Sequence, residues 1–233
     1  MIYHKYAAPV AALAAAWLLP TTAMTADSLA FNYLEVDYVN VDVDFSESFL
    51  VDADTTFRQR TSSDGGYRIG GAWEFYDRFH VFAEFSSADQ DLRATLNGVS
   101  AGKDNFDVER LRLGLGYSLP LSNVNSVYGR VSFDRTEFST RGVSTQTLST
   151  RTSDEGLGVE VGTLWNAAQN LQLQGHLRYT EVGELNAGAR NSFNDDVLVG
   201  VSGRWFLRDR FALQAGYEVG EIDTWNVGAR YTF

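Results

Sequence analysis

Histidine is the residue type in this chain best suited to acid–base chemistry, because its charge changes near neutral pH. The sequence has three histidines, His4, His80 and His176, and no cysteine. Nucleophilic catalysis would need a histidine beside a positioned hydroxyl, and no serine adjoins His176 in the sequence. We therefore expect His176 to join a polar network, and we predict no catalytic residue. A hydrolytic site that uses His176 remains an alternative.

Metal binding is the second kind of chemistry to consider. The pairs Asp52 and Asp54, and Asp89 and Asp91, could touch Ca²⁺. Neither pair continues into the spaced oxygen ligands and closing glutamate of an EF-hand, and a chain without cysteine lacks common zinc ligands. We interpret both pairs as solvated loop residues and predict no metal or other cofactor.

Arginines and acids form the most informative polar set. Many alternate with apolar residues, as in R-L-R-L-G-L-G-Y at residues 110–117, which places them on one face of a β-strand. Guanidinium groups pair carboxylates bidentately in confined spaces, and unpaired buried charges are costly. We predict an internal network in which acids and arginines satisfy one another. Its members are seven acids and seven arginines: Glu35, Asp37, Arg68, Glu74, Glu84, Arg110, Arg112, Arg130, Asp134, Glu160, Arg178, Arg204, Glu218 and Arg230.

The same alternation defines the strands that must position these charges. An even number of antiparallel strands closes a barrel with both termini on one side. The fold class is predicted to be all-β: a single antiparallel up-and-down transmembrane β-barrel of ten strands, with eight as the alternative. The strands are expected at about residues 31–44, 67–76, 79–87, 108–118, 127–134, 157–165, 171–179, 197–205, 211–219 and 223–233.

Connections between the strands alternate in length. Aromatic residues cluster near both ends of the strands, as expected at two membrane interfaces, whereas a soluble lipocalin-like barrel would not need them. Long loops on the outside and short turns on the periplasmic side are typical of an outer-membrane barrel. Short turns are predicted at residues 77–78, 119–125, 166–170 and 207–210, and long polar loops at 46–66, 88–106, 139–155 and 181–195.

The final strand presents an apolar face and ends the chain on an aromatic residue. That face consists of Trp225, Val227, Ala229, Tyr231 and Phe233. Such a face suits lipid contact on one side of a barrel wall. The pattern also resembles the terminal assembly signal of Gram-negative outer-membrane proteins. The resemblance implies handling by periplasmic chaperones and by the outer-membrane assembly machinery.

The first 26 residues are predicted to be a cleaved signal peptide. Lys5 supplies positive charge, residues 7–19 are apolar, and residues 21–26 include small side chains suited to cleavage after Ala26 or Ala23. The apolar run is shorter than the roughly 20 residues of a spanning helix. No linker divides the remainder, which predicts a single barrel domain at residues 27–233.

Charge and cysteine content limit the possible partners. The formal net charge is -11, and removal of Lys5 with the signal peptide would make it -12. This balance argues against nucleic acid as a partner. An exported chain without cysteine has no disulfides, so its hydrogen-bonded strand ladder must hold the fold together.

Several segments together resemble the small outer-membrane β-barrel proteins of Gram-negative bacteria, a porin-like superfamily that includes OmpA membrane domains and OmpX-type proteins. They are the signal peptide, L-A-F-N-Y-L-E-V-D-Y-V from Leu29, F-H-V-F-A-E-F from Phe79, and the terminus at Phe233. The resemblance covers essentially all of residues 27–233. It implies location in the outer membrane, among its lipids and lipopolysaccharide, but it specifies function weakly because one fold hosts many activities.

These observations predict a non-enzymatic integral outer-membrane protein with a charge-plugged lumen. We expect a monomer that acts through extracellular loops in envelope integrity, adhesion or lipopolysaccharide contact. The first alternative is a narrow porin-like channel for ions or small solutes. The second is a hydrolase at the barrel rim.

Overall fold

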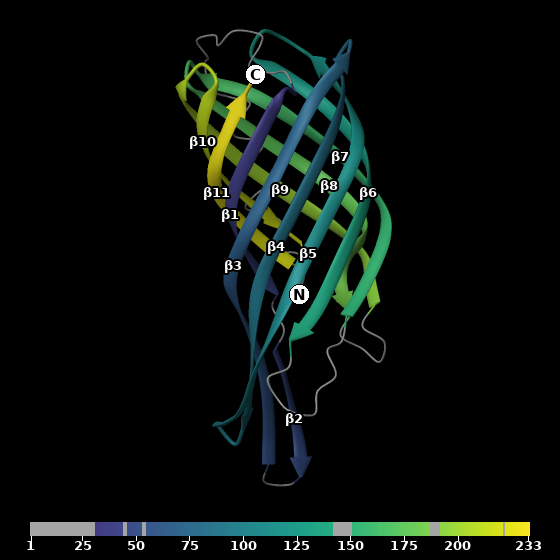
Figure 1. Cartoon of the computed structure of the whole chain (residues 1–233), viewed down its shortest axis with the longest axis vertical. Coiled ribbons are helices and arrows are strands. Elements are labelled where there is room, and N and C mark those ends of the chain that lie inside the picture. The colour runs from purple at the N-terminus through teal and green to yellow at the C-terminus, as the bar shows by residue number, and fades with distance from the viewer. Residues whose placement is uncertain (1–30, 44–45, 53–54, 142–150, 187–191, 221) are drawn as a thin grey trace.

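The structure, a computed structural model, describes residues 31–43, 46–52, 55–141, 151–186, 192–220 and 222–233. The predicted signal peptide lies outside these residues. No helix in the described ranges has the length and hydropathy needed to cross a membrane. The strands (Figure 1) are β1 (Tyr33–Val43), β2 (Ser46–Asp52), β3 (Thr55–Tyr76), β4 (Phe79–Leu96), β5 (Val99–Pro120), β6 (Asn125–Arg141), β7 (Arg151–Ala168), β8 (Leu171–Asn186), β9 (Ser192–Arg208), β10 (Phe211–Val219) and β11 (Ile222–Thr232).

The strands form one antiparallel sheet that closes on itself. From β3 to β11 each strand pairs with the next, and β1 pairs with both β11 and β3. β2 pairs with β3 beyond the end of β1, so β1 and β2 occupy one position in the wall. Counted in this way, the 11 strands form a ten-stranded barrel. The predicted fold class is confirmed, and the eight-stranded alternative is wrong.

Both described ends of the chain lie at one end of the barrel, called here the terminal end. The amide of Phe233 donates a hydrogen bond to the carbonyl oxygen of Asn32 at 3.1 Å, beside the start of β1. The tight turn at Asp77 and Arg78 lies at the same end, as predicted for short connections. The opposite end is called here the hairpin end.

At the hairpin end, the predicted long loops at residues 46–66 and 88–106 are wrong. β2 and β3, and β4 and β5, continue as paired strands that project beyond the barrel (Figure 1). The β4–β5 ladder runs to the pair Leu96 and Val99. Asn97 and Gly98 close it with φ values of 50° and 80°, as a type I′ hairpin turn requires. The sequence at residues 46–66 and 88–106 mixes apolar and polar residues without sustained alternation, so it lacks the pattern that reveals a strand.

The other two predicted loops are also partly strand. β6 extends to Arg141 and β7 begins at Arg151, within the range predicted as a loop at 139–155. Likewise, β8 and β9 take up most of the range 181–195. The described chain therefore contains a taller barrel wall than the sequence predicts.

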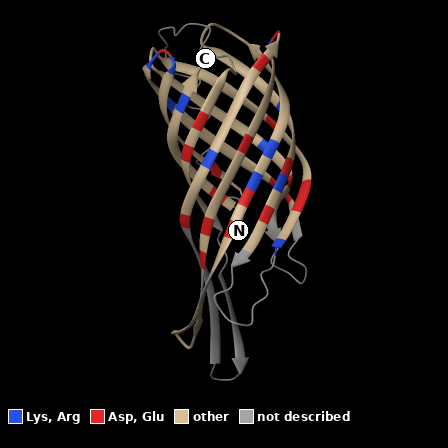
Figure 2. Ribbon diagram, viewed as in Figure 1, with Lys and Arg blue, Asp and Glu red and all other residues tan. Residues whose placement is uncertain are grey.

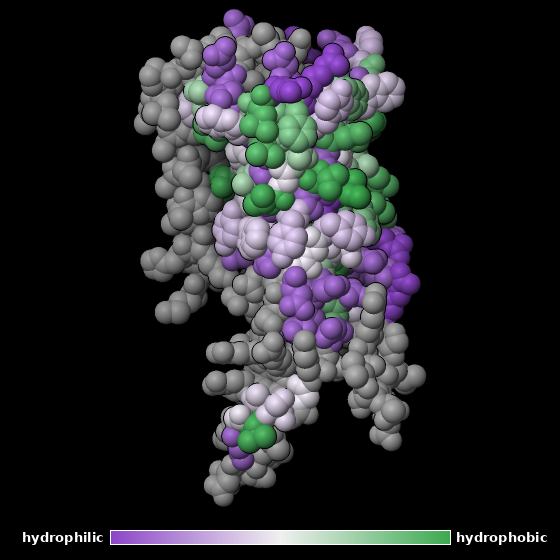
Figure 3. All heavy atoms as spheres, turned by 60° about the vertical axis from the view of Figure 1, so that its left-hand side comes forward, coloured by the Kyte–Doolittle hydropathy of each residue, from purple (hydrophilic) through white to green (hydrophobic). Residues whose placement is uncertain are grey.

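Side chains alternate across the wall. On β1, Leu34 and Val36 are 59% and 57% exposed, whereas Glu35 and Asp37 are 6% and 2% exposed. Charged residues of both signs are distributed over the wall (Figure 2). Hydrophobic side chains gather outside in a band between polar zones (Figure 3). An apolar exterior around a polar interior is the arrangement expected in lipid, and it is the reverse of a soluble barrel.

The interior also contains two apolar clusters. The terminal cluster consists of Phe31, Tyr33, Ala72, Phe82, Tyr128 and Leu164. The hairpin-side cluster consists of Val39, Val41, Ala88 and Ile222. The terminal cluster draws residues from β1, β3, β4, β6 and β7 and from the segment before β1, so it extends across the lumen.

Candidate functional site: the barrel lumen

The lumen brings together most of the predicted charged residues. Eleven of the fourteen take part in contacts between carboxylates and guanidinium groups, and these eleven are called here the lumen network. They are Glu35, Asp37, Arg68, Glu84, Arg112, Arg130, Asp134, Glu160, Arg178, Glu218 and Arg230.

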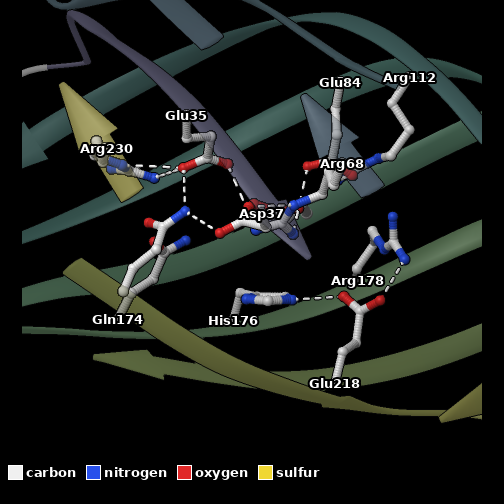
Figure 4. Close-up of polar contacts among 12 residues, drawn as sticks. Glu35, Asp37, Arg68, Glu84, Arg112, Gln174, His176, Arg178, Glu218 and Arg230 are labelled. Carbon is white, nitrogen blue, oxygen red and sulfur yellow. Dashed lines mark hydrogen bonds and ion pairs between the residues drawn. The ribbon is translucent and has the colours of Figure 1, made fainter. Parts of the chain in front are cut away.

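The part of the network on β1 is held from both neighbouring strands. Arg68 on β3 donates to Asp37 Oδ2 from Nε at 2.9 Å and from Nη2 at 2.7 Å. Arg230 on β11 donates from Nε to Glu35 Oε2 at 3.0 Å. Gln214 on β10 donates to Asp37 Oδ1 at 2.7 Å (Figure 4 shows the surrounding contacts). The closure of the barrel at β1 is therefore reinforced inside the lumen.

Arg112 on β5 forms the centre of the network. Its Nη2 lies 3.0 Å from Glu160 Oε2, its Nε 3.5 Å from Asp134 Oδ1, and its Nη1 3.8 Å from Glu84 Oε1. Glu84 also lies 3.9 Å from Arg68. This chain of contacts connects β3, β4, β5, β6 and β7 through side chains.

Arg130 on β6 spans the lumen. Its Nη2 donates to the hydroxyl of Tyr33 on β1 at 3.2 Å, and its Nη1 lies 3.4 Å from Glu160 Oε1. Its Nε donates to His80 Nε2 at 3.1 Å. The guanidinium carbon also lies 4.6 to 5.1 Å from three ring centroids of the terminal cluster, within the range of cation–π attraction. One buried side chain thus joins opposite walls.

His176 lies inside the barrel, as predicted, and contacts Glu218. Its Nε2 is 2.8 Å from Glu218 Oε2, and Arg178 Nη2 donates to Glu218 Oε1 at 2.7 Å (Figure 4). Gly200 lies between His176 and Glu218 in the strand register. A Cβ atom at Gly200 would come within 2.1 Å of the imidazole. The glycine lets His176 cross one strand to reach its partner.

Three predicted members of the network behave differently. Glu74 lies at the terminal end, where its Oε1 accepts a hydrogen bond from the Arg78 amide at 3.2 Å and so stabilises the turn. Arg110 is half-buried and has no ion pair within the described chain. Arg204 is buried, but among the described residues its hydrogen bonds go to glutamines. Alternation predicts which side of the wall these residues face, but it does not predict their partners.

Neutral residues complete the site, and the search for charges missed them. Arg204 donates to the side-chain oxygens of Gln172 at 2.9 Å and Gln214 at 3.4 Å, and it also contacts Gln174. The side-chain amide of Gln174 in turn donates to the Tyr128 hydroxyl. All these residues occupy inward positions by alternation, so the sequence contained a signal for them.

The catalytic and metal candidates do not assemble into a reactive centre in the described residues. His80 is fully buried and stacks on Phe31, with ring centroids 4.0 Å apart. Asp89 is exposed and Asp91 is buried, although both belong to β4. The interpretation of this pair as loop residues is therefore wrong, and so is the expectation that Asp91 is solvated. Asp52 and Asp54 have no described side chains. Within the described chain, no group of three or more His, Asp or Glu residues could hold a metal ion.

The predicted assembly residues share the outer face of β11. Trp225, Val227, Tyr231 and Phe233 are exposed, and Ala229 is half-buried between them. The face therefore continues the apolar band around the closing strand. Its role as an assembly signal remains a prediction.

Comparison with solved structures finds distant similarity to outer-membrane barrels. Neisserial surface protein A has 13% identity and a TM-score of 0.44, with 88% of this chain and 98% of that chain covered. OprG from Pseudomonas aeruginosa has 15% identity and a TM-score of 0.47, with coverages of 88% and 96%. Ail from Yersinia pestis has 14% identity and a TM-score of 0.37, with coverages of 86% and 95%. A search among curated proteins finds no match.

Comparison of the sequence with models of protein families gives a match over nearly the whole chain, and the matched family has the same barrel fold as this structure. The family model described as "Outer membrane protein beta-barrel domain" matches residues 11–233. The chain therefore belongs to the outer membrane protein β-barrel family, which places it in the outer membrane of Gram-negative bacteria.

Proposed function

We propose that this protein is a non-enzymatic barrel with a closed lumen, which anchors its projecting hairpins at the cell surface. The observation that carries the proposal is the contact of Arg130 with Tyr33 across the lumen, at 3.2 Å. Arg130 is joined through Glu160 to Arg112 and so to the rest of the lumen network. A wide pore would keep its charged side chains apart and hydrated, whereas here they meet and occupy the interior.

The projecting hairpins are the proposed functional surface. β2–β3 and β4–β5 project beyond the rest of the barrel (Figure 1), and their paired backbones hold them in a defined shape. The proposed roles are envelope integrity, adhesion or contact with lipopolysaccharide, with outer-membrane lipids around the barrel. The assembly machinery and periplasmic chaperones are the proposed partners during insertion, and the mature protein is proposed to be a monomer.

Display of the hairpin end can be tested at Asn97 and Gly98, the turn that closes β4 and β5. An epitope inserted there should bind antibody on intact cells, and one inserted beside Asp209, in a turn at the terminal end, should bind only after permeabilisation. The reverse result would overturn the proposed orientation.

The surface role can be tested by shortening the same hairpin. Removal of residues 92–95 and 100–104, which face one another across a β-bulge, retains the Asn97–Gly98 turn and the register of the remaining β4–β5 pairs. The variant should still form a heat-modifiable barrel, and cells that carry it should lose adhesion or become sensitive to detergent. Unchanged adhesion and detergent resistance, with normal amounts of folded barrel, would contradict a surface role for this hairpin.

A narrow channel is the second candidate function. The observation that favours it is a polar cavity of about 90 Å³ within the lumen, lined by network residues such as Arg112, Glu160 and Glu218. A cavity of that size can hold water, and a path from it to both ends of the barrel would conduct. The hydrolase alternative has less support, because His176 Nε2 is engaged by Glu218 inside the lumen.

A further inference from the structure

The projecting hairpins bring cationic residues of three strands into one row. Beyond the end of β1, the strands β2, β3, β4 and β5 continue as a four-stranded antiparallel sheet (Figure 1). Arg60 on β3 is paired in register with Arg93 on β4, and Arg93 is paired on its other side with Lys103 on β5. Three cations therefore occupy directly opposed positions on neighbouring strands.

A second row on the same face of the sheet adds a fourth cation. Arg58 lies two residues from Arg60 on β3, so both residues belong to one face. From Arg58 the register continues through Thr95 to Ser100. Neither of these two described rows contains an acidic residue. Their members, called here the cationic face, are four cations and four residues with hydroxyl groups: Ser46, Ser48, Arg58, Arg60, Arg93, Thr95, Ser100 and Lys103.

The charge of this face is concentrated. Neighbouring strands lie about 4.8 Å apart, so Arg60 and Lys103 are separated by only about 10 Å across the row. An acid of the same face, Asp91, lies one row closer to the barrel, paired with Ser62, and is 3% exposed. Like charges at directly opposed positions destabilise a sheet. Such a row on a chain with a formal net charge of -11 indicates a surface for an anionic ligand.

The cationic face also lies well outside the membrane. Phe85 is an aromatic residue on the outer face of β4, with its ring centroid 6.0 Å from that of Tyr67, and such residues mark the membrane interface. From Phe85 to Arg93, β4 covers about 26 Å of strand, which at a tilt of about 45° rises about 18 Å. The headgroup layer on each side of a bilayer is about 5–8 Å thick. The ligand of the cationic face is therefore expected beyond the lipid phosphates.

We propose that the cationic face binds a linear sulfated polysaccharide outside the membrane. A chain that carries sulfate groups on successive sugars can follow the row from Arg60 to Lys103. Guanidinium and ammonium groups form charge-assisted hydrogen bonds with anionic oxygen atoms, and hydroxyl groups can exchange hydrogen bonds with sugars. Binding also relieves the repulsion within the row. This inference rests on the proposed surface role of the hairpins and names the class of ligand for it.

The test is retention of the full mature chain, purified in detergent, on immobilised dextran sulfate and on neutral dextran. The protein should bind dextran sulfate and not dextran, and added salt should release it because ion pairs at a surface are screened. The overall negative charge of the chain opposes such binding, so retention requires a local cationic surface. Equal behaviour on the two polymers would overturn the proposal.

Substitutions in the row locate the site. Arg60→Gln, Arg93→Gln and Lys103→Gln should each weaken binding to soluble dextran sulfate about threefold to fivefold, as one surface ion pair contributes. The triple variant should lose binding, whereas Arg93→Lys keeps the charge and should retain it. All should form heat-modifiable barrels, because none adds a charge to the repulsive row.

Arg151→Gln is the matched control. Arg151 is an exposed residue at the hairpin end, with 68% of its side chain accessible, but it belongs to β7 and not to the projecting hairpins. The control should bind dextran sulfate as tightly as the unmodified protein does. Equal weakening by Arg151→Gln and by the row variants would contradict the assignment to the cationic face.

Competition separates a sulfated polysaccharide from lipopolysaccharide. Purified lipopolysaccharide should not displace the protein from dextran sulfate. Displacement at lower concentrations than soluble dextran sulfate requires would assign the face to lipopolysaccharide and overturn the proposal. Failure here is distinguishable from failure of the surface role. If shortening of the β4–β5 hairpin reduces adhesion while the unmodified protein ignores dextran sulfate, the surface role stands and the polysaccharide is refuted.

Discussion

At the scale of single residues, Arg112 and Arg130 show that the buried charges of the lumen network depend on one another for their partners. Arg112 faces three carboxylates, and Arg130 faces Glu160 together with aromatic rings. Both side chains are less than 10% exposed. Removal of one member leaves its partners charged and buried, which costs more free energy than the intact contact contributes.

The Arg112→Ala substitution should therefore lower the thermal unfolding midpoint of the barrel in detergent. The loss of one partner from a buried charge pair typically costs about 3–5 kcal/mol, and less where water enters. Glu160→Ala should have a similar effect, because it removes the shared partner of Arg112 and Arg130.

Arg151→Ala is the matched control, because Arg151 pairs with Glu137 on β6 at the hairpin end and is itself exposed. A hydrogen bond from Arg151 holds the pKa of Glu137 below its usual value. Without Arg151, the buried Glu137 keeps Arg135 as a partner at 3.4 Å, and the contacts of an exposed arginine contribute little to stability. Equal midpoints for Arg112→Ala and Arg151→Ala would contradict the structural role of the lumen network.

At the scale of elements, the terminal cluster closes one end of the lumen with a residue that belongs to no strand. Phe31 precedes β1, is 2% exposed, and stacks on His80. Its ring meets Tyr128 edge-on, with centroids 5.3 Å apart. Aromatic packing of this kind adds stability beyond the buried area, and it covers the lumen network from the terminal end.

The Phe31→Ala substitution should open this end to small reagents. The chain contains no cysteine, so a single Ser202→Cys substitution in the cavity lining reports access directly. Labelling of that cysteine by a charged thiol reagent should be slow with Phe31 present and markedly faster in the Phe31→Ala background. Equal labelling rates would show that the terminal cluster does not limit access.

Strands were predictable wherever one face of the wall contacts lipid. Leu34, Val36 and Tyr38 stand out against Glu35 and Asp37 because each face has a single environment. The hairpin extensions lack this sustained alternation in their sequence, and they were therefore predicted to be loops. The dipeptide Asn97–Gly98 is of the type that closes tight hairpins, and it does so in the structure.

The partners within the lumen could not be predicted from alternation alone. The sequence places Glu74 and Arg204 inward, but their contacts depend on their height in the barrel and on strand register. Glu74 lies beside the turn at Arg78 and accepts its backbone hydrogen bond, whereas Arg204 lies beside Gln172 and donates to its side chain. Contacts between distant strands, such as that of Arg130 with Tyr33, depend on the curvature of the whole sheet.

At the scale of the whole molecule, the first and last strands pair with each other, and the two ends of the described chain meet at the terminal end of the barrel. β1 pairs with β11 along its full length, from Tyr33 with Thr232 to Val43 with Ile222. Phe233 then binds the backbone of Asn32. The last strand is therefore required to close the sheet, and it presents the apolar face predicted to be an assembly signal.

Deletion of Phe233 should reduce the amount of folded barrel in the outer membrane and divert chains to periplasmic proteolysis. Heat-modifiable protein in membrane fractions measures the first effect, and degradation products measure the second. Deletion of the exposed turn residue Asp209 is a control for a general loss of stability. Normal levels of folded barrel without Phe233 would favour a merely interfacial role for this aromatic side chain.

Conductance of the purified, unmodified protein in a planar lipid bilayer tests the closed lumen most directly. The lumen network and the terminal cluster predict no steady current across the bilayer, and they predict that Arg112→Ala or Phe31→Ala introduces a leak. A steady, voltage-independent conductance of the unmodified protein would contradict the closed barrel and support a narrow channel.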